Sequence, residues 1–325
     1  MRHFKKFLYH PIKNLFAKYY LVFLRKFTSI KVVGITGSAG KTTTKEMIAS
    51  VLKLSGSTVY SKDNIDPVYN IATTILRCNL KTKYLVLEMG IEKPGEMNFY
   101  MWLVKPDIGV ITNIFPTHTE FLGNIEGVLN EKSILVKNTN LAVLNKNDQR
   151  LLFLGKGLKS KVYWFNKTNE SATETVCKIL NISENQIKKG LKSYQKPNHR
   201  LKVVNHQSGA VIFDDSYNSN PEAFLFSLKK FLLYAKNNKK VAVVGDMLEL
   251  GAISKSEHLR IAKNLAKYKF EKIIGVGNLV NLITKNTFLN YEKALPEVKK
   301  YLKPGFYIFI KGSRSIGLDK LIDRL

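Results

Sequence analysis

A glycine-rich segment between an expected strand and an expected helix limits the fold of this chain more than any other feature. It reads Gly-Ile-Thr-Gly-Ser-Ala-Gly-Lys-Thr-Thr and runs from Gly34 to Thr43. A short β-branched run over residues 31–35 predicts a buried strand before it, and a helical pattern over residues 41–54 follows it. A glycine-rich turn in this position is typical of loops that bind phosphate groups. We therefore expect an α/β fold in which this loop binds a nucleotide.

The residue types of this loop predict its chemistry. Its glycines let backbone N–H groups turn toward phosphate oxygens, and the start of the following helix adds partial positive charge. Lys41 can reach the terminal phosphates, and the Thr42 hydroxyl can ligate Mg²⁺. The predicted nucleotide-binding residues are Gly37, Ser38, Ala39, Gly40, Lys41, Thr42 and Thr43.

Strand and helix patterns alternate along the rest of the chain. At about 150 residues per domain, 325 residues predict two domains. After the loop, strands are expected at 84–88, 108–112 and 141–144, and a second series at 210–214, 240–245, 272–276 and 306–310. Helical stretches between strands indicate mainly parallel sheets covered by helices. A Pro-Asn-His break near residues 197–200 marks the boundary. We expect a central ATPase-like domain over 31–200 and a smaller Rossmann-like domain over 201–325.

Composition excludes several classes of protein. Hydrophobic residues make up 45% of the chain, which excludes a disordered protein. The longest apolar run near the start, residues 19–24, is far shorter than the ~20 residues of a spanning helix. Cys78 and Cys177 are too few for a disulfide framework or a cysteine-rich metal site, so a cytoplasmic protein is expected.

The chain is strongly basic. It carries 52 Lys and Arg against 25 Asp and Glu, a formal net charge of +27. One explanation is that the positive charge attracts anions, and the other is that the lysines only occupy solvent-exposed positions without a binding role. The sequence leaves both explanations open. Because the lysines are scattered, no specific nucleic-acid partner is expected.

The first thirty residues form a region of their own. They hold seven basic residues and eight aromatic residues, and no acidic residue occurs before Glu46. Apolar residues recur at steps of three and four, which places them on one helix face: Phe4, Leu8, Ile12, Leu15, Tyr19, Phe23 and Phe27. Such a helix can lie in the interface of an anionic membrane, or it can pack its apolar face on the following domain. The sequence leaves both possibilities open.

The loop, together with several segments after it, resembles the Mur ligase family. The matching segments are Leu87-Glu88-Met89-Gly90, Pro106-Asp107, Thr112-Asn113, His118 and Leu122-Gly123. The resemblance implies an ATP-dependent, ADP-forming ligase that turns a carboxylate into an acyl phosphate, which an amine then attacks. Bringing two anions together requires cations, which Lys41, Mg²⁺ and an arginine would supply.

Three later segments carry a finer resemblance within the family. They span residues 214–221, 245–251 and 311–315, and they most resemble the branch that adds D-alanyl-D-alanine to a cell-wall peptide precursor. The implied partners are therefore a small-molecule or peptide precursor and an amino-acid or dipeptide donor.

The resemblance also implies roles for individual residues. Glu88 and His118 would hold a second Mg²⁺ with Lys132, which several family members carbamylate, and Arg200 would contact the γ-phosphate. Further nucleotide contacts are implied for Asn64, Asp214, Asp215 and Asn218, and contacts with substrate carboxylates for Lys311 and Arg314. The alternatives are structural: an exposed lysine at 132, a helix N-cap cluster ahead of Pro221, and a solvated loop around residues 311–314.

The chain also departs from the family pattern. Only about thirty residues precede the first strand, too few for the uridine-nucleotide-binding domain of these relatives. Where the relatives usually have Pro-Gly-Arg, this chain has Asn198-His199-Arg200. Where they have a His-Asn-x-x-Asn segment, this chain has only Asn166-Lys167-Thr168-Asn169. Two alternatives therefore stay open: a non-catalytic nucleotide-binding or scaffold protein, and a ligase like folylpolyglutamate synthase. The sequence makes no prediction about the oligomeric state.

Overall fold

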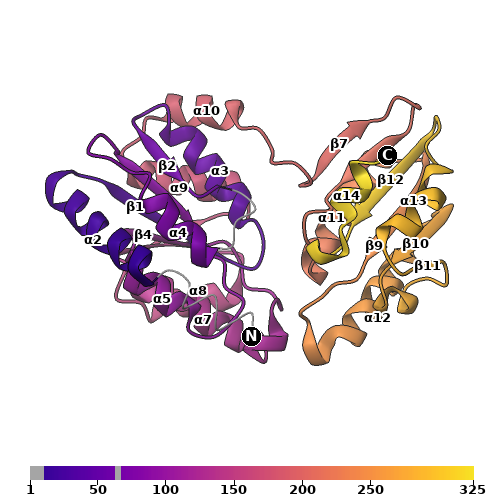
Figure 1. The fold of residues 1–325 in the computed structure, drawn as a ribbon, viewed down its shortest axis with the longest axis horizontal. Coiled ribbons are helices and arrows are strands. Elements are labelled where there is room, and N and C mark those ends of the chain that lie inside the picture. The colour runs from indigo at the N-terminus through magenta and orange to yellow at the C-terminus, as the bar shows by residue number, and fades with distance from the viewer. Residues whose placement is uncertain (1–10, 63–66) are drawn as a thin grey trace. The chain divides into compact units, whose positions relative to one another are not determined.

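The computed structural model describes residues 11–62 and 67–325 and divides into two compact units (Figure 1). The N-terminal unit comprises the described residues up to Phe115 together with Phe121–Gln195. The C-terminal unit comprises Pro116–Glu120 and Lys196–Leu325. A five-residue strap, residues 116–120, thus belongs by its contacts to the C-terminal unit although it lies early in the sequence.

The N-terminal unit is built on a six-stranded parallel sheet with the order β2-β3-β1-β4-β5-β6. Its strands are β1 (Lys31–Thr36), β2 (Thr58–Tyr60), β3 (Tyr84–Glu88), β4 (Ile108–Ile111), β5 (Leu141–Asn145) and β6 (Lys161–Phe165). All but the first residue of β1 are buried, as expected for a central strand covered on both faces. In the register, Ile35 pairs with Glu88 and Thr36 with Ile111, so β1, β3 and β4 end at one edge.

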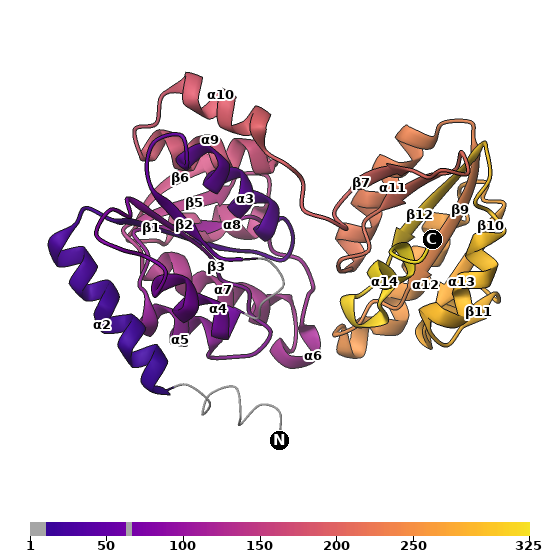
Figure 2. The same ribbon diagram turned by 45° about the horizontal axis from the view of Figure 1, so that its top comes forward.

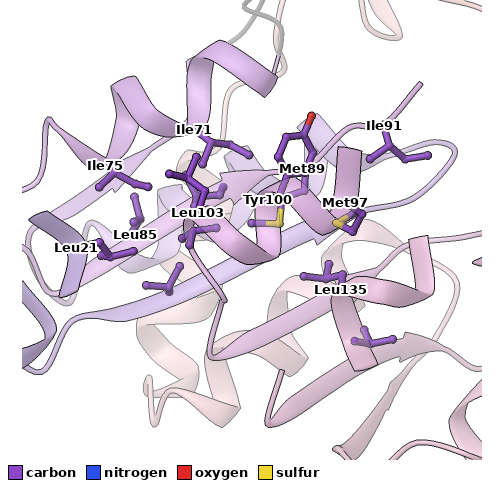
Figure 3. Close-up of a cluster of buried hydrophobic side chains, with 14 of the residues drawn as sticks. Leu21, Ile71, Ile75, Leu85, Met89, Ile91, Met97, Tyr100, Leu103 and Leu135 are labelled. Carbon is purple, nitrogen blue, oxygen red and sulfur yellow. The ribbon is translucent and has the colours of Figure 1, made fainter. Parts of the chain in front are cut away.

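Helices cover both faces of this sheet (Figure 2). One face is covered by α3 (Lys41–Leu52), α9 (Asn169–Ile179) and α10 (Glu184–Ser193). The other is covered by α2 (Pro11–Phe27), α4 (Pro67–Ile75), α5 (Glu96–Leu103), α7 (Ile125–Lys137) and α8 (Gln149–Lys156). Figure 3 shows part of the hydrophobic core between the sheet and this second group of helices, where Leu21 of α2 and Ile75 of α4 meet Leu85 of β3. A short helix, α6 (Thr119–Leu122), begins within the strap.

Helix α2 packs on this unit, but not through the face that the sequence pattern predicts. Ala17, Leu21 and Leu24 are its buried residues, and α2 contacts α4 and α5. The described part of the predicted stripe is exposed instead: Ile12, Leu15, Tyr19, Phe23 and Phe27. Phe4 and Leu8 lie outside the described residues. Of the two possibilities that the sequence left open, packing of this stripe on the domain is not what the structure shows, because α2 has two apolar faces and the other one is buried.

The C-terminal unit contains a second six-stranded sheet with the order β11-β10-β9-β12-β8-β7. Its strands are β7 (Lys202–Asn205), β8 (Val211–Asp214), β9 (Lys239–Gly245), β10 (Lys272–Val276), β11 (Thr287–Phe288) and β12 (Phe306–Lys311). All pairs are parallel except β7 with β8. One face is covered by α11 (Pro221–Ala235) and α12 (Ser254–Leu265), the other by α13 (Tyr291–Lys299) and α14 (Leu318–Ile322). The predicted fold class is confirmed: a mainly parallel α/β domain followed by a smaller α/β domain.

Two further observations concern the cysteines and the length of the helices. Cys78 and Cys177 are free and buried, and burial raises the pKa of each thiol to about 12. Over the described ranges, no helix combines the length and the apolar character needed to cross a bilayer.

Candidate active site

The glycine-rich loop lies between β1 and α3, and two of its glycines are required by the backbone. Gly37 has φ 143° and Gly40 has φ 80°, values that side chains disfavour. A β-carbon at Gly37 would lie 1.9 Å from Thr112 Oγ1, and one at Gly40 would lie 2.6 Å from Asn169 Oδ1. The loop is therefore closely surrounded by side chains that follow β4 and β6.

Residues directly after β4 hold the loop in place. Asn113 Oδ1 accepts a hydrogen bond from Ala39 N (2.8 Å), and Asn113 Nδ2 donates to Ala39 O (3.0 Å). Thr112 Oγ1 also donates to Ala39 O (2.6 Å), and Ser38 Oγ donates to Phe115 O (2.9 Å). The sequence did not predict residues 112–115 as site residues. The signal that could have found them is their position just after a strand that ends beside the loop.

Three predicted site residues meet where β1, β3 and α3 converge. Lys41 Nζ donates to Gly37 O (2.9 Å) and so bridges the loop. The nearly buried Thr42 donates to Glu88 Oε1 (3.0 Å), and Glu88 N donates to Ser61 Oγ (3.0 Å). A hydroxyl beside a carboxylate suits Mg²⁺, which prefers oxygen ligands.

Thr42 and Glu88 offer two oxygen ligands to a metal ion. Among the residues that the structure describes, no group of three or more His, Cys, Asp or Glu side chains could hold a metal ion. Mg²⁺ usually keeps several waters and takes substrate phosphate oxygens in addition to one or two protein ligands. The Thr42–Glu88 pair therefore fits Mg²⁺ held together with a nucleotide.

A buried lysine lies close to this group. Lys45 is fully buried and donates to Ser61 O (2.7 Å), with its Nζ 3.9 Å from Glu88 Oε2. The sequence did not predict it, because a lysine on the first turns of a helix is ordinarily exposed. Lys45 Nζ also lies 2.9 Å from Glu46 Oε1, so this buried lysine is placed between two carboxylates beside the loop.

Lys132 on α7 is not the exposed lysine of the structural alternative. It is fully buried, and its Nζ has no hydrogen-bond partner in the described part of the chain. Burial, reinforced by the positive charge of Lys41, holds the pKa of Lys132 well below its usual range, although Glu131 and Glu96 act in the opposite direction. Both effects favour the neutral amine form of this side chain, which lies close to Lys41 of the phosphate loop.

His118 lies on the strap and is described with the C-terminal unit, whereas Glu88 belongs to the N-terminal unit. His118 Nδ1 lies 2.6 Å from Glu249 Oε2, and Thr119 Oγ1 donates to Leu250 O (2.9 Å). Both His118 (φ 57°) and Glu249 (φ 64°) have left-handed backbones. These contacts hold the strap against residues 249–250.

The other predicted residues of the C-terminal unit form two linked groups. In the first, the Tyr217 ring is in contact with two guanidinium groups: Arg200 is 3.8 Å and Arg314 is 5.0 Å from its centroid. Arg314 also donates to Tyr217 Oη (2.9 Å). The sequence did not predict Tyr217 as a site residue, although it stands inside the segment that carries the finer resemblance.

In the second group, Asp214 and Asp215 hold the segment that enters this unit. The buried Asp214 is 2.9 Å from His199 Nδ1, and Asp215 Oδ1 accepts from Leu201 N (3.1 Å). Lys311 contacts Asp215 Oδ2 and donates to Asn218 O (3.0 Å).

These contacts contradict one structural alternative and part of another. Lys311 is only 2% exposed, so it is not a solvated loop residue, whereas Arg314 is exposed, as that alternative expects. The side chain that caps α11 is Asn220, which accepts from Ala223 N, so the two aspartates are not its N-cap. The predicted nucleotide contact Asn64 lies outside the described residues.

A phosphate loop after the first strand of a parallel sheet, followed by a second α/β unit, defines a two-domain nucleotide-binding protein. The sequence profile of the Mur ligase middle domain matches residues 35–209, and that of the Mur ligase glutamate ligase domain matches residues 199–314. The chain therefore belongs to the Mur ligase family, and the resemblance inferred from its motifs is confirmed.

Individual relatives agree. The chain is 29% identical to UDP-N-acetylmuramoyl-tripeptide–D-alanyl-D-alanine ligase of Buchnera aphidicola, over 93% of this chain and 78% of the relative. It is similar to MurF from Acinetobacter baumannii, with a TM-score of 0.87 and 24% identity over 96% of this chain and 79% of that one. It is also similar to MurF ligase from Thermotoga maritima in complex with ADP, with a TM-score of 0.82 and 25% identity over 94% and 82%.

Proposed function

We propose that this chain is an ATP-dependent, ADP-forming ligase that joins D-alanyl-D-alanine to a UDP-N-acetylmuramoyl-tripeptide. The observation that carries the proposal is the grouping of Lys41, Thr42 and Glu88 around a braced phosphate loop in a member of the Mur ligase family. The substrates are taken from the name of the Buchnera relative. That name also favours this reaction over the one catalysed by folylpolyglutamate synthase.

In the proposed reaction, the loop and Lys41 bind the phosphates of ATP. The substrate carboxylate attacks the γ-phosphorus and releases ADP, and the amine then attacks the acyl phosphate and releases phosphate. Lys41 neutralises negative charge as the two anions approach each other. Thr42 and Glu88 would hold Mg²⁺, which supplies further positive charge when it is bound.

The buried amine of Lys132 supports carbamylation at this position. A neutral amine can add CO₂ and release a proton, which converts the side chain into an anionic carbamate. The positive charge of Lys41 would attract the carbamate, whereas the negative charges of Glu131 and Glu96 would act against it. We propose that the carbamate takes part in a second magnesium site.

By the family resemblance, His118 would join Glu88 as a protein ligand of that second site. Metal-ligating histidines usually bond their other ring nitrogen to a carboxylate or carbonyl group. The contact between His118 Nδ1 and Glu249 provides such a partner and makes Nε2 the ligating atom. Glu249 is then a positioning residue.

In the C-terminal unit, we propose that Arg200 contacts the γ-phosphate and that Arg314 contacts a substrate carboxylate. The Tyr217 ring, which contacts both guanidinium groups, supports a common site for these two arginines. Lys311 acts through Asp215 and Asn218, because it is buried and bonded to both. We propose that these three residues shape the loop that faces the nucleotide.

The test is a reconstituted reaction with the full chain. ADP release is measured with UDP-N-acetylmuramoyl-tripeptide and D-alanyl-D-alanine together and with each omitted, and the product is identified by mass spectrometry. We expect ADP release that depends on both substrates. Nucleotide binding without turnover under all conditions would instead support a non-catalytic nucleotide-binding protein. Turnover with a folate and glutamate would support a ligase like folylpolyglutamate synthase.

A further inference from the structure

Helix α2 exposes an aromatic and aliphatic surface on the side opposite to its packed face. We call this the aromatic face of α2, and it consists of Ile12, Leu15, Phe16, Tyr19, Val22, Phe23 and Phe27. Ile12 is 83% exposed, Phe16 64% and Phe27 61%. Figure 2 shows α2 along the outside of the N-terminal unit. Large apolar surfaces of this kind generally mark a site of interaction.

The helix is fixed in this orientation by contacts along its length. Lys13 Nζ donates to Thr73 Oγ1 (2.7 Å), and Tyr20 Oη donates to Cys78 O (2.8 Å). At the other end, Arg25 donates to Lys105 O (2.8 Å). Together with the buried Ala17, Leu21 and Leu24, these contacts prevent α2 from rotating its aromatic face onto the unit.

The charged side chains of α2 are all basic, and one of them, Arg25, also lies 3.7 Å from Asp107 Oδ2 of the N-terminal unit. In the sequence, no acidic residue occurs before Glu46, and seven basic residues lie in the first thirty. Within α2, Lys26 lies next to Phe27, and Lys18 lies over the exposed Trp102 of α5 at 4.3 Å from its ring centroid. Lysine and arginine side chains can extend from an apolar surface so that their charged ends reach an anionic layer.

This distribution of charge selects among possible partners. A second copy of this chain would bring another strongly basic surface against the first, since each chain carries a formal net charge of +27. An anionic lipid surface offers acyl chains to the aromatic residues and negative headgroups to the lysines. We propose that α2 lies in the interface of an anionic membrane with its aromatic face toward the acyl chains.

The test is flotation of the full chain with lipid vesicles. We expect binding to vesicles of phosphatidylcholine with phosphatidylglycerol, weaker binding at high salt, and little binding to phosphatidylcholine alone. The double variant Phe16→Ser/Phe23→Ser should reduce partitioning at least about tenfold, because two buried aromatic groups are lost. Lys26→Gln should reduce it about fivefold.

A matched control uses exposed apolar residues elsewhere. Phe153 on α8 is 79% exposed and Leu233 on α11 is 65% exposed, so Phe153→Ser/Leu233→Ser removes similar surface away from α2. This control should float like the parent chain, and both double variants should retain the parent's melting temperature and lipid-free ATP turnover.

Three results would overturn the proposal. One is the absence of flotation with the anionic vesicles. Another is an equal loss of binding in the α2 variant and in the control. The third is a dimer in sedimentation that Phe16→Ser/Phe23→Ser converts to a monomer while lipid binding is absent, which would make the aromatic face an interface between two copies.

Discussion

His199 Nδ1 lies 2.9 Å from the buried Oδ2 of Asp214, at the point where the chain enters the C-terminal unit. His199 has φ 62°, and Leu201, two residues later, has φ 49°. Left-handed backbone is unfavourable for residues other than glycine. The histidine therefore stands where the related pattern has glycine, and its bond to Asp214 offsets part of the backbone strain.

This relationship predicts different effects for two substitutions at the same position. His199→Ala loses the bond to Asp214 and keeps the strain, so it should lower the free energy of unfolding by about 1–3 kcal/mol. His199→Gly loses the same bond but removes the strain, and should be about 1 kcal/mol more stable than His199→Ala. Urea unfolding of both variants measures this order. Equal stability of the two variants would show that the left-handed backbone at residue 199 carries no strain.

Lys41→Ala should reduce ATP turnover about 10²–10³-fold, because a positive charge is lost where negative charge gathers in the transition state. The fold should be unchanged, since the Lys41 ammonium bonds to Gly37 O within its own loop. Steady-state ADP release and thermal melting measure the two effects. Lys53→Ala is the control, because Lys53 follows the same helix and its Nζ bonds to Tyr60 Oη at the surface. An unchanged turnover number for Lys41→Ala would contradict the assignment of the phosphate loop.

Glu88→Gln and His118→Ala should raise the Mg²⁺ concentration needed for half-maximal rate. A carboxamide lacks the charge of a carboxylate, and removal of the imidazole removes the proposed ligand of the second site. Turnover measured across a Mg²⁺ titration tests both variants. Glu126→Gln serves as the control, because Glu126 is a largely exposed carboxylate at the start of α7. If both variants keep the parent's Mg²⁺ dependence, Glu88 and His118 have structural roles only.

Lys132→Met should abolish turnover without lowering stability. An apolar side chain fits a fully buried position that offers no hydrogen-bond partner to an amine, so the free energy of unfolding should stay equal or rise. The pH dependence has a defined sign. The pKa of Lys132 is lower in the folded chain than in the unfolded chain. At pH values between these two pKa values, the unfolded chain binds a proton at Lys132 and the folded chain does not. The stability of the parent should therefore rise with pH relative to Lys132→Met.

Urea unfolding of the parent and of Lys132→Met in CO₂-free buffer, from about pH 7 to about pH 10, measures this trend. A constant difference between the two proteins would show that Lys132 keeps an ordinary pKa. The carbamate itself is detected separately by ¹³C NMR after addition of labelled bicarbonate. Its absence at saturating bicarbonate would remove Lys132 from the proposed second metal site.

The strands that the sequence predicted are largely those buried on both faces. The continuous apolar runs of β1, β3, β9 and β12 indicate strands from the amino-acid pattern alone. The strands that the sequence did not predict are β2, β6, β7 and β11, which are the four edges of the two sheets. An edge strand is short or half-exposed, so it lacks the apolar run on which the prediction depends.

The sequence could predict those site residues whose positions are set by their neighbours in the same loop. Lys41 and Thr42 follow from the loop, because spacing within one turn fixes their positions. The bond between Asn113 and Ala39 and the burial of Lys45 depend on how strands are ordered in the sheet. The same limit explains the result for α2, where both faces are apolar and periodicity does not indicate which one is buried.

The strap has a consequence for any attempt to separate the two units. Because Pro116–Glu120 packs with the C-terminal unit, the polypeptide passes from one unit to the other at three places: after Phe115, after Glu120 and after Gln195. A fragment that starts at Lys196 would leave Glu249 and Leu250 without His118 and Thr119. Cutting the backbone near residue 196 would sever only one of the three covalent crossings. The compact unit at the C-terminal end is therefore discontinuous in sequence, and a fragment that keeps its contacts must include the strap as a second chain or a grafted loop.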